Sequence, residues 1–165
     1  MNVRLPANAP KTTEEAFARV RELHKGATLD DLPILALAEA IGLKLYENLA
    51  DGVENPEVKK LLLQNGREEL AHAHRVSKAI EILTGEPFPI PPIEENPFYS
   101  PLPKAPVTKA SLAKLAAAEF AGEDMYAAIA KSFDNAEAEA LFRQNGREEV
   151  GHGARLEKAA ALMAH

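Results

Sequence analysis

Glutamates and histidines at helical spacing are the residues of this chain best suited to chemistry. The motif Glu-x-x-His occurs at Glu69–His72 and again at Glu149–His152. Side chains three residues apart lie on one face of a helix, so both side chains of a motif can reach the same metal ion. Oxygen and imidazole donors without thiolate suit iron or manganese, and zinc is also compatible. A single such motif, however, is usually a solvated pair on a helix surface.

Both motifs belong to an internal repeat with an offset of 80 residues. Residues 33–84 align with residues 113–164 without a gap, and 20 of the 52 aligned positions are identical. The segment Gln64–Glu69 recurs unchanged as Gln144–Glu149. Chance alignment does not produce this agreement, so we interpret the chain as a duplicated helical hairpin.

Each repeat contains two amphipathic helical patterns joined by a short turn. In the first repeat, apolar residues recur at three- and four-residue spacing along 35–49 and again along 58–83. The second repeat predicts helices over about 109–132 and from 135 to about 163. The residues expected to start these four helices are Asp31 with Pro33, Asn55 with Pro56, Thr108, and Asp134 or Asn135.

A proline-rich crossover connects the two hairpins. Residues 85–107 contain eight prolines, which favour extended chain and exclude a continuing helix. Such a segment reaches roughly 70 Å at about 3 Å per residue, whereas a 30-residue helix is about 45 Å long. The second and third bundle helices can therefore run parallel. A short amphipathic helix is also expected at 12–26, on the outside of the bundle or on a partner chain.

The spacing to each turn predicts that the polar residues meet at one height. The first repeat supplies Glu39 as a partner for Glu69, and their midpoint, position 54, falls in the first turn. The midpoint of the equivalent pair in the second repeat, position 134, falls in the second turn. Four carboxylates in an apolar core are very unfavourable unless cations balance them. We therefore predict a two-metal site formed by Glu39, Glu69, His72, Glu119, Glu149 and His152.

Composition and charge exclude several other classes of protein. The net charge of −6 and the lack of a basic stripe argue against nucleic-acid binding. The chain has no cysteine, which excludes disulfides, thiolate metal sites and Cys-ligated iron–sulfur centres. No apolar run is long enough to span a membrane, and Met1–Pro10 does not resemble a signal peptide. We expect one domain over 1–165 in the cytoplasm.

With these motifs, the chain resembles the ferritin-like superfamily, which includes ferritins, bacterioferritins, rubrerythrins and di-iron oxygenases. The resemblance covers about 33–84 and 109–164 and implies an all-α, ferritin-like four-helix bundle. It also implies two iron ions that react with dioxygen or hydrogen peroxide, and an electron donor that the sequence does not identify. Glu69 and Glu149 would bridge the metals, Glu39 and Glu119 would be terminal ligands, and each metal would take one histidine.

The sequence departs from the rubrerythrin pattern in two places. Rubrerythrins usually carry a Cys-ligated rubredoxin centre, and this chain has no cysteine. They also place an additional glutamate where this chain has Gly122, and Glu123 lies one position away. The resemblance therefore places the chain in the superfamily and leaves its subfamily open.

Further residues are expected around the ligands. Metal-bound histidine normally donates its second ring N–H to a carboxylate or carbonyl group. By resemblance to di-iron oxygenases, we expect Glu68 to bond to His152 and Glu148 to bond to His72. The alternative is that both glutamates are solvated surface charges.

Tyrosines, asparagines and glycines also recur near the predicted ligands. Tyr46 and Tyr126 follow the terminal glutamates by two turns on the same helix face. They are either core residues or relays for protons or electrons. Asn65 and Asn145 could bond to these tyrosines or to a ligand water. The repeated glycines at 42, 66, 122 and 146 allow close helix packing or leave room for a small substrate.

The leading functional hypothesis is a di-iron, or manganese–iron, oxidoreductase of the oxidase or peroxidase type. The alternative is an iron-binding or ferroxidase storage protein that works as an oligomer. A third interpretation is a structural bundle with zinc or without metal. We expect no nucleic-acid or membrane partner, and a homodimer is compatible with the sequence.

Overall fold

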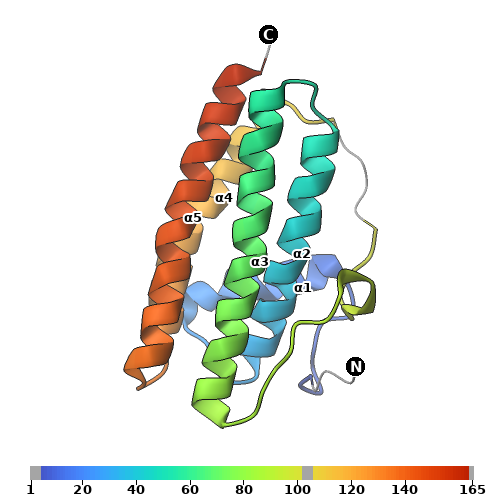
Figure 1. The fold of residues 1–165 in the computed structure, drawn as a ribbon. Helices are drawn as coiled ribbons and strands as arrows, with labels where there is room; N and C mark the ends of the chain where they lie inside the picture. Colours follow the sequence, from blue (N-terminus) through green and yellow to red (C-terminus); the bar gives the residue numbers. More distant parts are fainter. Residues whose placement is uncertain (1–4, 102–105, 164–165) are drawn as a thin grey trace.

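The computed structural model describes residues 5–101 and 106–163. All regular elements in these ranges are helices, and five α-helices pack as a bundle (Figure 1), which confirms the predicted all-α, ferritin-like fold. Residues 102–105 of the expected crossover, residue 164 of the expected second hairpin and the first four residues lie outside the described ranges. The elements are α1 (Thr13–Arg21), the 3-10 helix η1 (Glu22–Lys25), α2 (Asp31–Asp51), α3 (Pro56–Thr84), the 3-10 helix η2 (Ile93–Glu95), α4 (Lys109–Ala130) and α5 (Ala136–Leu162).

Three of the four bundle helices begin at a residue that the sequence identified. The Asn55 side chain accepts the backbone N–H of Glu57 at 2.9 Å at the start of α3. Asn135 does the same for α5, and Thr108 forms a reciprocal capping box with Ser111 at the start of α4. These bonds satisfy backbone N–H groups that have no partner inside the helix.

The start of α2 differs from the prediction. Its N-cap is Asp30, which makes no side-chain capping bond, and Asp31 is already helical. The Asp31 carboxylate instead accepts the N–H of Thr28 at 2.9 Å and the Arg19 guanidinium at 2.6 Å. A partner on α1 therefore replaces the local cap, and Asp31 joins the N-terminal helix to the bundle.

The expected N-terminal helix over 12–26 consists of two parts. Thr12 caps α1 through the N–H of Glu15, and the chain tightens into η1 after Arg21. Gly26 ends η1 with a φ of 108°, a conformation that glycine adopts without strain. Together α1 and η1 pack against α2 and α4 and cover one side of the bundle (Figure 1).

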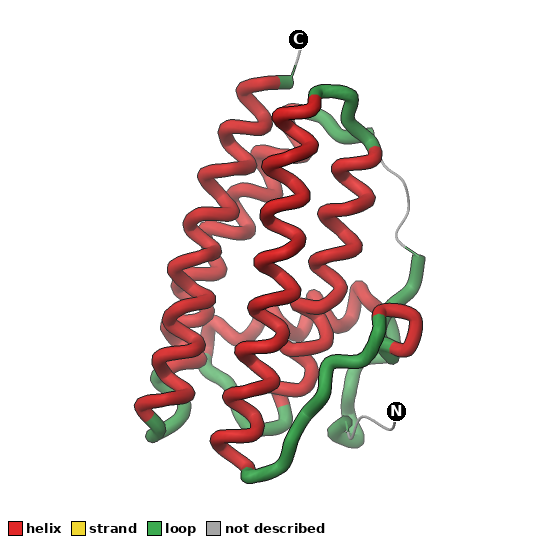
Figure 2. Tube along the Cα trace, viewed as in Figure 1, coloured by secondary structure: helices red, strands yellow, loops and turns green. Residues whose placement is uncertain are grey.

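The crossover runs along the outside of the bundle, so that α3 and α4 point in the same direction (Figures 1 and 2). It leaves α3 at Gly85 and contains η2. Asn96 Nδ2 donates to the Leu37 carbonyl at 2.9 Å, and the buried Phe98 accepts a 2.6 Å bond from Thr13 at its carbonyl. The crossover is therefore fastened to both α1 and α2.

Two apolar cores fill the bundle. The large core joins the first half of α2 to the second halves of α3 and α4, the first turns of α5, the α1–η1 segment and the crossover. The small core joins the second half of α2 to the starts of α3 and α4 and the end of α5. On α3, α4 and α5 a polar layer separates the two cores. Among the described residues, no helix has both the length and the apolar composition needed to cross a membrane.

Candidate metal centre

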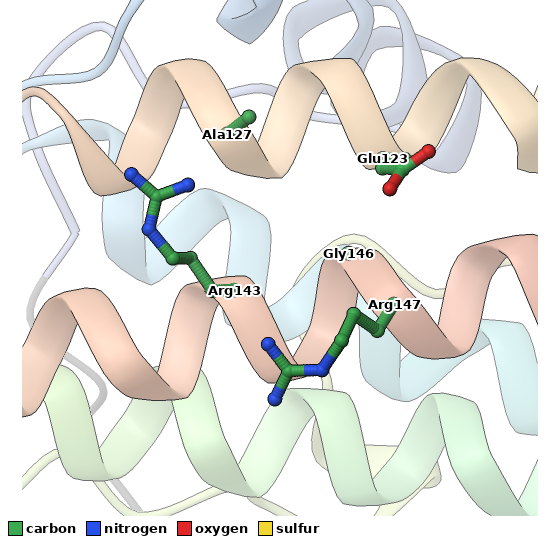
Figure 3. Close-up of a pocket in the computed structure, with 5 residues that line it drawn as sticks. All are labelled: Glu123, Ala127, Arg143, Gly146 and Arg147. Carbon is green, nitrogen blue, oxygen red and sulfur yellow. The ribbon is translucent and has the colours of Figure 1, made fainter.

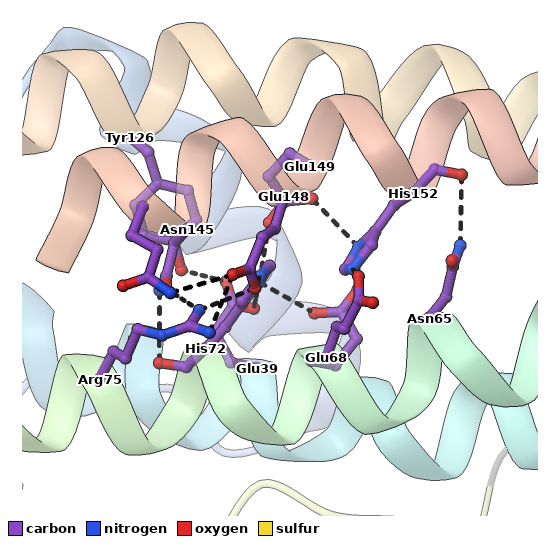
Figure 4. A network of polar contacts seen from close by, with 12 residues as sticks. Glu39, Asn65, Glu68, His72, Arg75, Tyr126, Asn145, Glu148, Glu149 and His152 are labelled. Carbon is purple, nitrogen blue, oxygen red and sulfur yellow. Dashed lines mark hydrogen bonds and ion pairs between the residues drawn. The ribbon is translucent and has the colours of Figure 1, made fainter.

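The polar layer brings together the six residues that the sequence singled out. Each of the four bundle helices contributes a glutamate, and α3 and α5 also contribute a histidine. Figure 4 labels Glu39, Glu149 and both histidines of this layer. His72 and His152 have no exposed surface, and the three glutamates Glu39, Glu69 and Glu149 are 5–8% exposed. One donor atom from each of Glu69, His72, Glu149 and His152 lies within 4.8 Å of the others, an arrangement that fits a di-iron site.

Two of the glutamates each face both histidines. Glu69 places Oε2 3.8 Å from His72 Nδ1 and Oε1 3.3 Å from His152 Nδ1. Glu149 places Oε1 3.2 Å from His72 Nδ1 and Oε2 3.5 Å from His152 Nδ1. This is the geometry that a carboxylate needs to span two metals, with one oxygen directed to each position.

The other two glutamates each face a single histidine. Glu39 Oε2 lies 3.5 Å from His72 Nδ1, and Glu119 Oε2 lies 3.4 Å from His152 Nδ1. The two imidazole rings are stacked, with centroids 5.0 Å apart. The layer therefore has two equivalent halves related by a pseudo-two-fold axis.

The second ring nitrogen of each histidine faces a glutamate on the opposite helix. Glu148 Oε2 lies 3.1 Å from His72 Nε2, and Glu68 Oε2 lies 3.2 Å from His152 Nε2 (Figure 4). Neither glutamate is a freely solvated surface charge, since their side chains are 27% and 28% exposed. These partners leave both Nδ1 atoms directed at the four central carboxylates.

Each tyrosine bonds to a terminal glutamate of the other hairpin. Tyr46 OH donates to Glu119 Oε1 at 2.6 Å, and Tyr126 OH donates to Glu39 Oε1 at 2.8 Å. Both tyrosines are fully buried in the apolar cores, so they are core residues and hydrogen-bond donors to the layer at once. Burial is the largest cause that raises the pKa of both phenols well above the ordinary value.

The ionisation of the layer reflects its excess of carboxylates. Burial, with the charge of Glu119, raises the pKa of Glu69 well above its ordinary range, and burial raises that of Glu149 to about 7. Burial by itself lowers the pKa of a histidine, but bonds to the surrounding carboxylates outweigh it and raise the pKa of both His72 and His152 to about 12. The histidines thus act as the counter-charges when no cation is bound.

The donor atoms of the layer fit two divalent cations. His72 Nδ1 and His152 Nδ1 are buried and have no hydrogen-bond partner within 5–101 and 106–163. Buried polar atoms without partners are rare and point to an absent ligand or ion. Both Nδ1 atoms face carboxylate oxygens, and four carboxylates balance the charge of two divalent ions.

The repeated glycines allow close packing around the glutamates and tyrosines. A Cβ at Gly42 would lie 2.8 Å from Glu69 Cγ, and one at Gly122 would lie 2.8 Å from Glu149 Cγ. A Cβ at Gly66 would lie 2.9 Å from Tyr46 Cβ. Side chains that belong to the layer occupy these spaces, so the glycines leave no room for a substrate.

The asparagines and arginines connect α3 to α5 beside the layer. Asn65 and Asn145 donate to the backbone carbonyls of His152 and His72, each at 3.3 Å. They also bond to Tyr46 and Tyr126, as the sequence led us to expect. Arg75 and Arg155 form inter-helix bonds to Glu148 and Glu68. The only signal for these roles was that the same residues recur in both halves of the sequence.

Glu123 lies outside the layer. It is exposed and lines a shallow hollow between α4 and α5 with Arg143 and Arg147 (Figure 3). His74 is exposed as well and makes no contact with the layer.

A comparison with protein families gives one match. The family model described as Rubrerythrin matches residues 36–161, a range that contains all six residues of the layer. No curated protein and no solved structure matches the chain.

Proposed function

The chain belongs to the rubrerythrin family, and we propose that it is a di-iron, or manganese–iron, oxidoreductase whose centre reacts with dioxygen or hydrogen peroxide. The observation that carries the proposal is the pair Glu69 and Glu149, each of which faces both histidines. A single-metal site would not need two carboxylates in that position. Zinc would fit the donors, but it would not supply redox chemistry.

The distances support the ligand roles that we propose. Glu69 and Glu149 would bridge the two ions. Glu39 with His72 would complete one position, and Glu119 with His152 the other, with each histidine binding through Nδ1. Two iron ions held there would supply the electrons and the Lewis acidity that reduction of dioxygen or peroxide requires.

The surrounding residues hold the donors in the protonation state that a metal needs. Glu148 accepts from His72 Nε2, so the proton of the neutral ring stays on that nitrogen and the Nδ1 lone pair is free. A bond from His72, assisted by Arg75, lowers the pKa of Glu148 to about 2, so it stays an acceptor. The raised pKa values of Tyr46 and Tyr126 keep them as donors that orient the terminal carboxylates. The two apolar cores exclude bulk water from the ends of the layer.

The proposal is tested by loading the protein with ferrous iron without oxygen and then adding dioxygen or hydrogen peroxide in separate experiments. We expect two irons per chain and rapid growth of the near-ultraviolet absorbance of oxidised iron. The faster oxidant identifies the natural reaction. Failure to bind a second metal, or iron that neither oxidant converts, would contradict the proposal. A large hollow assembly in light scattering would favour the storage function instead.

A further inference from the structure

Each histidine of the layer begins and ends a ring of polar contacts between α3 and α5. Arg75 lies one turn after His72, and its guanidinium binds Glu148 through two nitrogens, Nη1 to Oε2 at 2.9 Å and Nη2 to Oε1 at 3.0 Å. Nη1 also donates to Asn145 Oδ1 at 2.7 Å. Glu148 returns to the His72 ring at Nε2, and Asn145 returns to the His72 carbonyl (Figure 4).

A second ring starts from the opposite helix, and its arginine reaches its glutamate through one nitrogen rather than two. Arg155 lies one turn after His152, forms an ion pair with Glu68 and donates from Nε to Asn65 Oδ1 at 2.5 Å. Glu68 returns to His152 Nε2, and Asn65 returns to the His152 carbonyl. The two rings therefore connect both metal-facing helices twice.

We propose that Arg75 and Arg155 are positioning residues that fix the orientation of His72 and His152 and thereby set the metal affinity of the centre. This inference rests on the proposed function. The hydrogen bonds and ion pairs of the two arginines go to Glu148, Asn145, Glu68 and Asn65 and not to the four central carboxylates, so each arginine acts through the glutamate and the asparagine that it holds. Both guanidinium groups are largely buried, with side chains 20% and 19% exposed, which limits their exchange with water.

The fork of the Arg75 guanidinium is the property that the first ring uses. A carboxylate held at both oxygens cannot rotate, so the oxygen of Glu148 that faces His72 Nε2 stays in place. A third bond from the same group aligns Asn145, which supports the His72 backbone. A lysine would keep the positive charge but has no planar fork, so it could not hold both oxygens of Glu148 in one fixed geometry.

The arginines also balance charge, and this second role must be separated from positioning. Two divalent ions would balance the four central glutamates, and the two arginines would balance Glu68 and Glu148. If charge alone mattered, lysine would replace arginine without loss. If positioning matters, Arg75→Lys loses affinity almost as Arg75→Met does.

The test measures Co²⁺ binding to the full chain without oxygen, through the visible absorbance of the bound ion. Arg67 on the same helix is exposed and has no side-chain bond to another residue of 5–101 or 106–163, so Arg67→Lys is the matched control. We expect Arg75→Lys and Arg75→Met to weaken one of two Co²⁺ equivalents about 10–100-fold, as loss of outer-sphere partners does. Arg67→Lys should stay within about twofold of the unmodified chain, by analogy with ordinary surface substitutions.

A second measurement separates positioning from general loss of structure. In the Zn²⁺-loaded, ¹⁵N-histidine-labelled protein, NMR should show two slowly exchanging Nε2–H protons. Arg75→Lys should accelerate the exchange of the His72 proton and leave the His152 proton unchanged, and Arg155→Lys should do the reverse. A merely structural role would affect both protons together.

The outcomes distinguish this inference from the proposed function. An unmodified chain that binds fewer than two Co²⁺ ions would overturn the proposed metal site. An unmodified chain that binds two, together with an Arg75→Lys variant of unchanged affinity and unchanged His72 exchange, would overturn the positioning role alone. If Arg75→Met does not fold, the two lysine variants decide the question.

Discussion

The two hairpins contribute the same residues to the metal centre but have different surroundings. The first half of α2 is enclosed by α1 and the crossover, and Leu32 to Gly42 are buried almost throughout. The α4 helix exposes a face that includes Ala113, Ala117 and Ala121. The tyrosine bonds to Glu39 and Glu119 nevertheless measure 2.8 and 2.6 Å. Contacts between the two hairpins therefore hold the layer, and the segments that cover the hairpins, α1 and the crossover, do not.

The largest expected effect comes from removing a carboxylate that both halves share. Glu69→Gln should eliminate the second metal equivalent, because both metal positions lose a donor. The same change should stabilise the metal-free protein, since burial beside other carboxylates already raises the pKa of Glu69. Metal analysis and thermal unfolding measure the two effects. Glu123→Gln, which changes an exposed acid, is the control. If Glu69 were merely structural, its substitution would not weaken metal binding while raising the stability of the metal-free protein.

The different surroundings should appear in the free energy of unfolding. Leu35 and Leu115 are equivalent in the repeat, but Leu35 is fully buried and Leu115 is half-buried. Leu35→Ala should cost about 2–5 kcal/mol because it leaves a cavity in the large core. Leu115→Ala should cost about 1–2 kcal/mol because less apolar surface is lost. Denaturant unfolding measures both, and both variants should still bind two metals. Equal losses of unfolding free energy in the two variants would contradict the unequal burial of Leu35 and Leu115.

The affinity of both halves for metal should depend on pH, because metal binding displaces protons from the histidines. In the metal-free protein both histidines are positively charged at neutral pH, with a proton on each ring nitrogen, because their pKa is raised to about 12. A metal must displace the proton from Nδ1, so the affinity for each ion should rise about tenfold per pH unit. Zn²⁺ titration in weak buffer at pH 8 should release at least two protons per chain. Release below one proton would mean that the histidines are not ligands.

The glycines give a smaller, local test of the same equivalence. Gly42→Ala and Gly122→Ala each place a methyl group 2.8 Å from a glutamate that faces both histidines. The overpacking cost of about 1–3 kcal/mol should exceed the helix-propensity gain of about 1 kcal/mol. Both variants should therefore be less stable and bind metal more weakly. Gly151→Ala, where the new atom lies 3.4 Å from Arg155, should be neutral or stabilising in the same unfolding measurement.

The smallest expected effects come from the tyrosines. Tyr46→Phe and Tyr126→Phe each remove one bond to a terminal glutamate and keep the ring in its core. The free energy of unfolding of each metal-loaded variant should fall by about 1 kcal/mol. Thermal unfolding should give the same loss in both, within error, despite the different surroundings. A large difference would show that the cover of each hairpin does influence the layer.

The parts of the fold that the sequence predicts depend on local rules. Asn55, Thr108 and Asn135 cap helices through their own neighbours, so their roles are visible in the sequence. The common height of the glutamates follows from the rise of a helix and the distance to its turn. Neither result requires knowledge of how the helices pack.

The parts that escape prediction depend on tertiary packing. Asp31 bonds to Arg19 on α1, a partner that a local capping rule does not include. Asn145 and Arg75 meet only because α3 and α5 lie side by side at this point. The half-burial of Leu115 against the full burial of Leu35 likewise follows from where α1 and the crossover lie. Matching motifs in the two repeats predict matching ligands but do not predict unequal surroundings.

The central claim is that one layer binds two metals, and Mössbauer spectroscopy tests it most directly. The protein would be loaded with ⁵⁷Fe²⁺ without oxygen, analysed for iron per chain, and then oxidised. We predict two irons per chain that form a magnetically coupled ferric pair. A single iron, or two irons with the spectrum of isolated ions, would contradict the shared carboxylate layer.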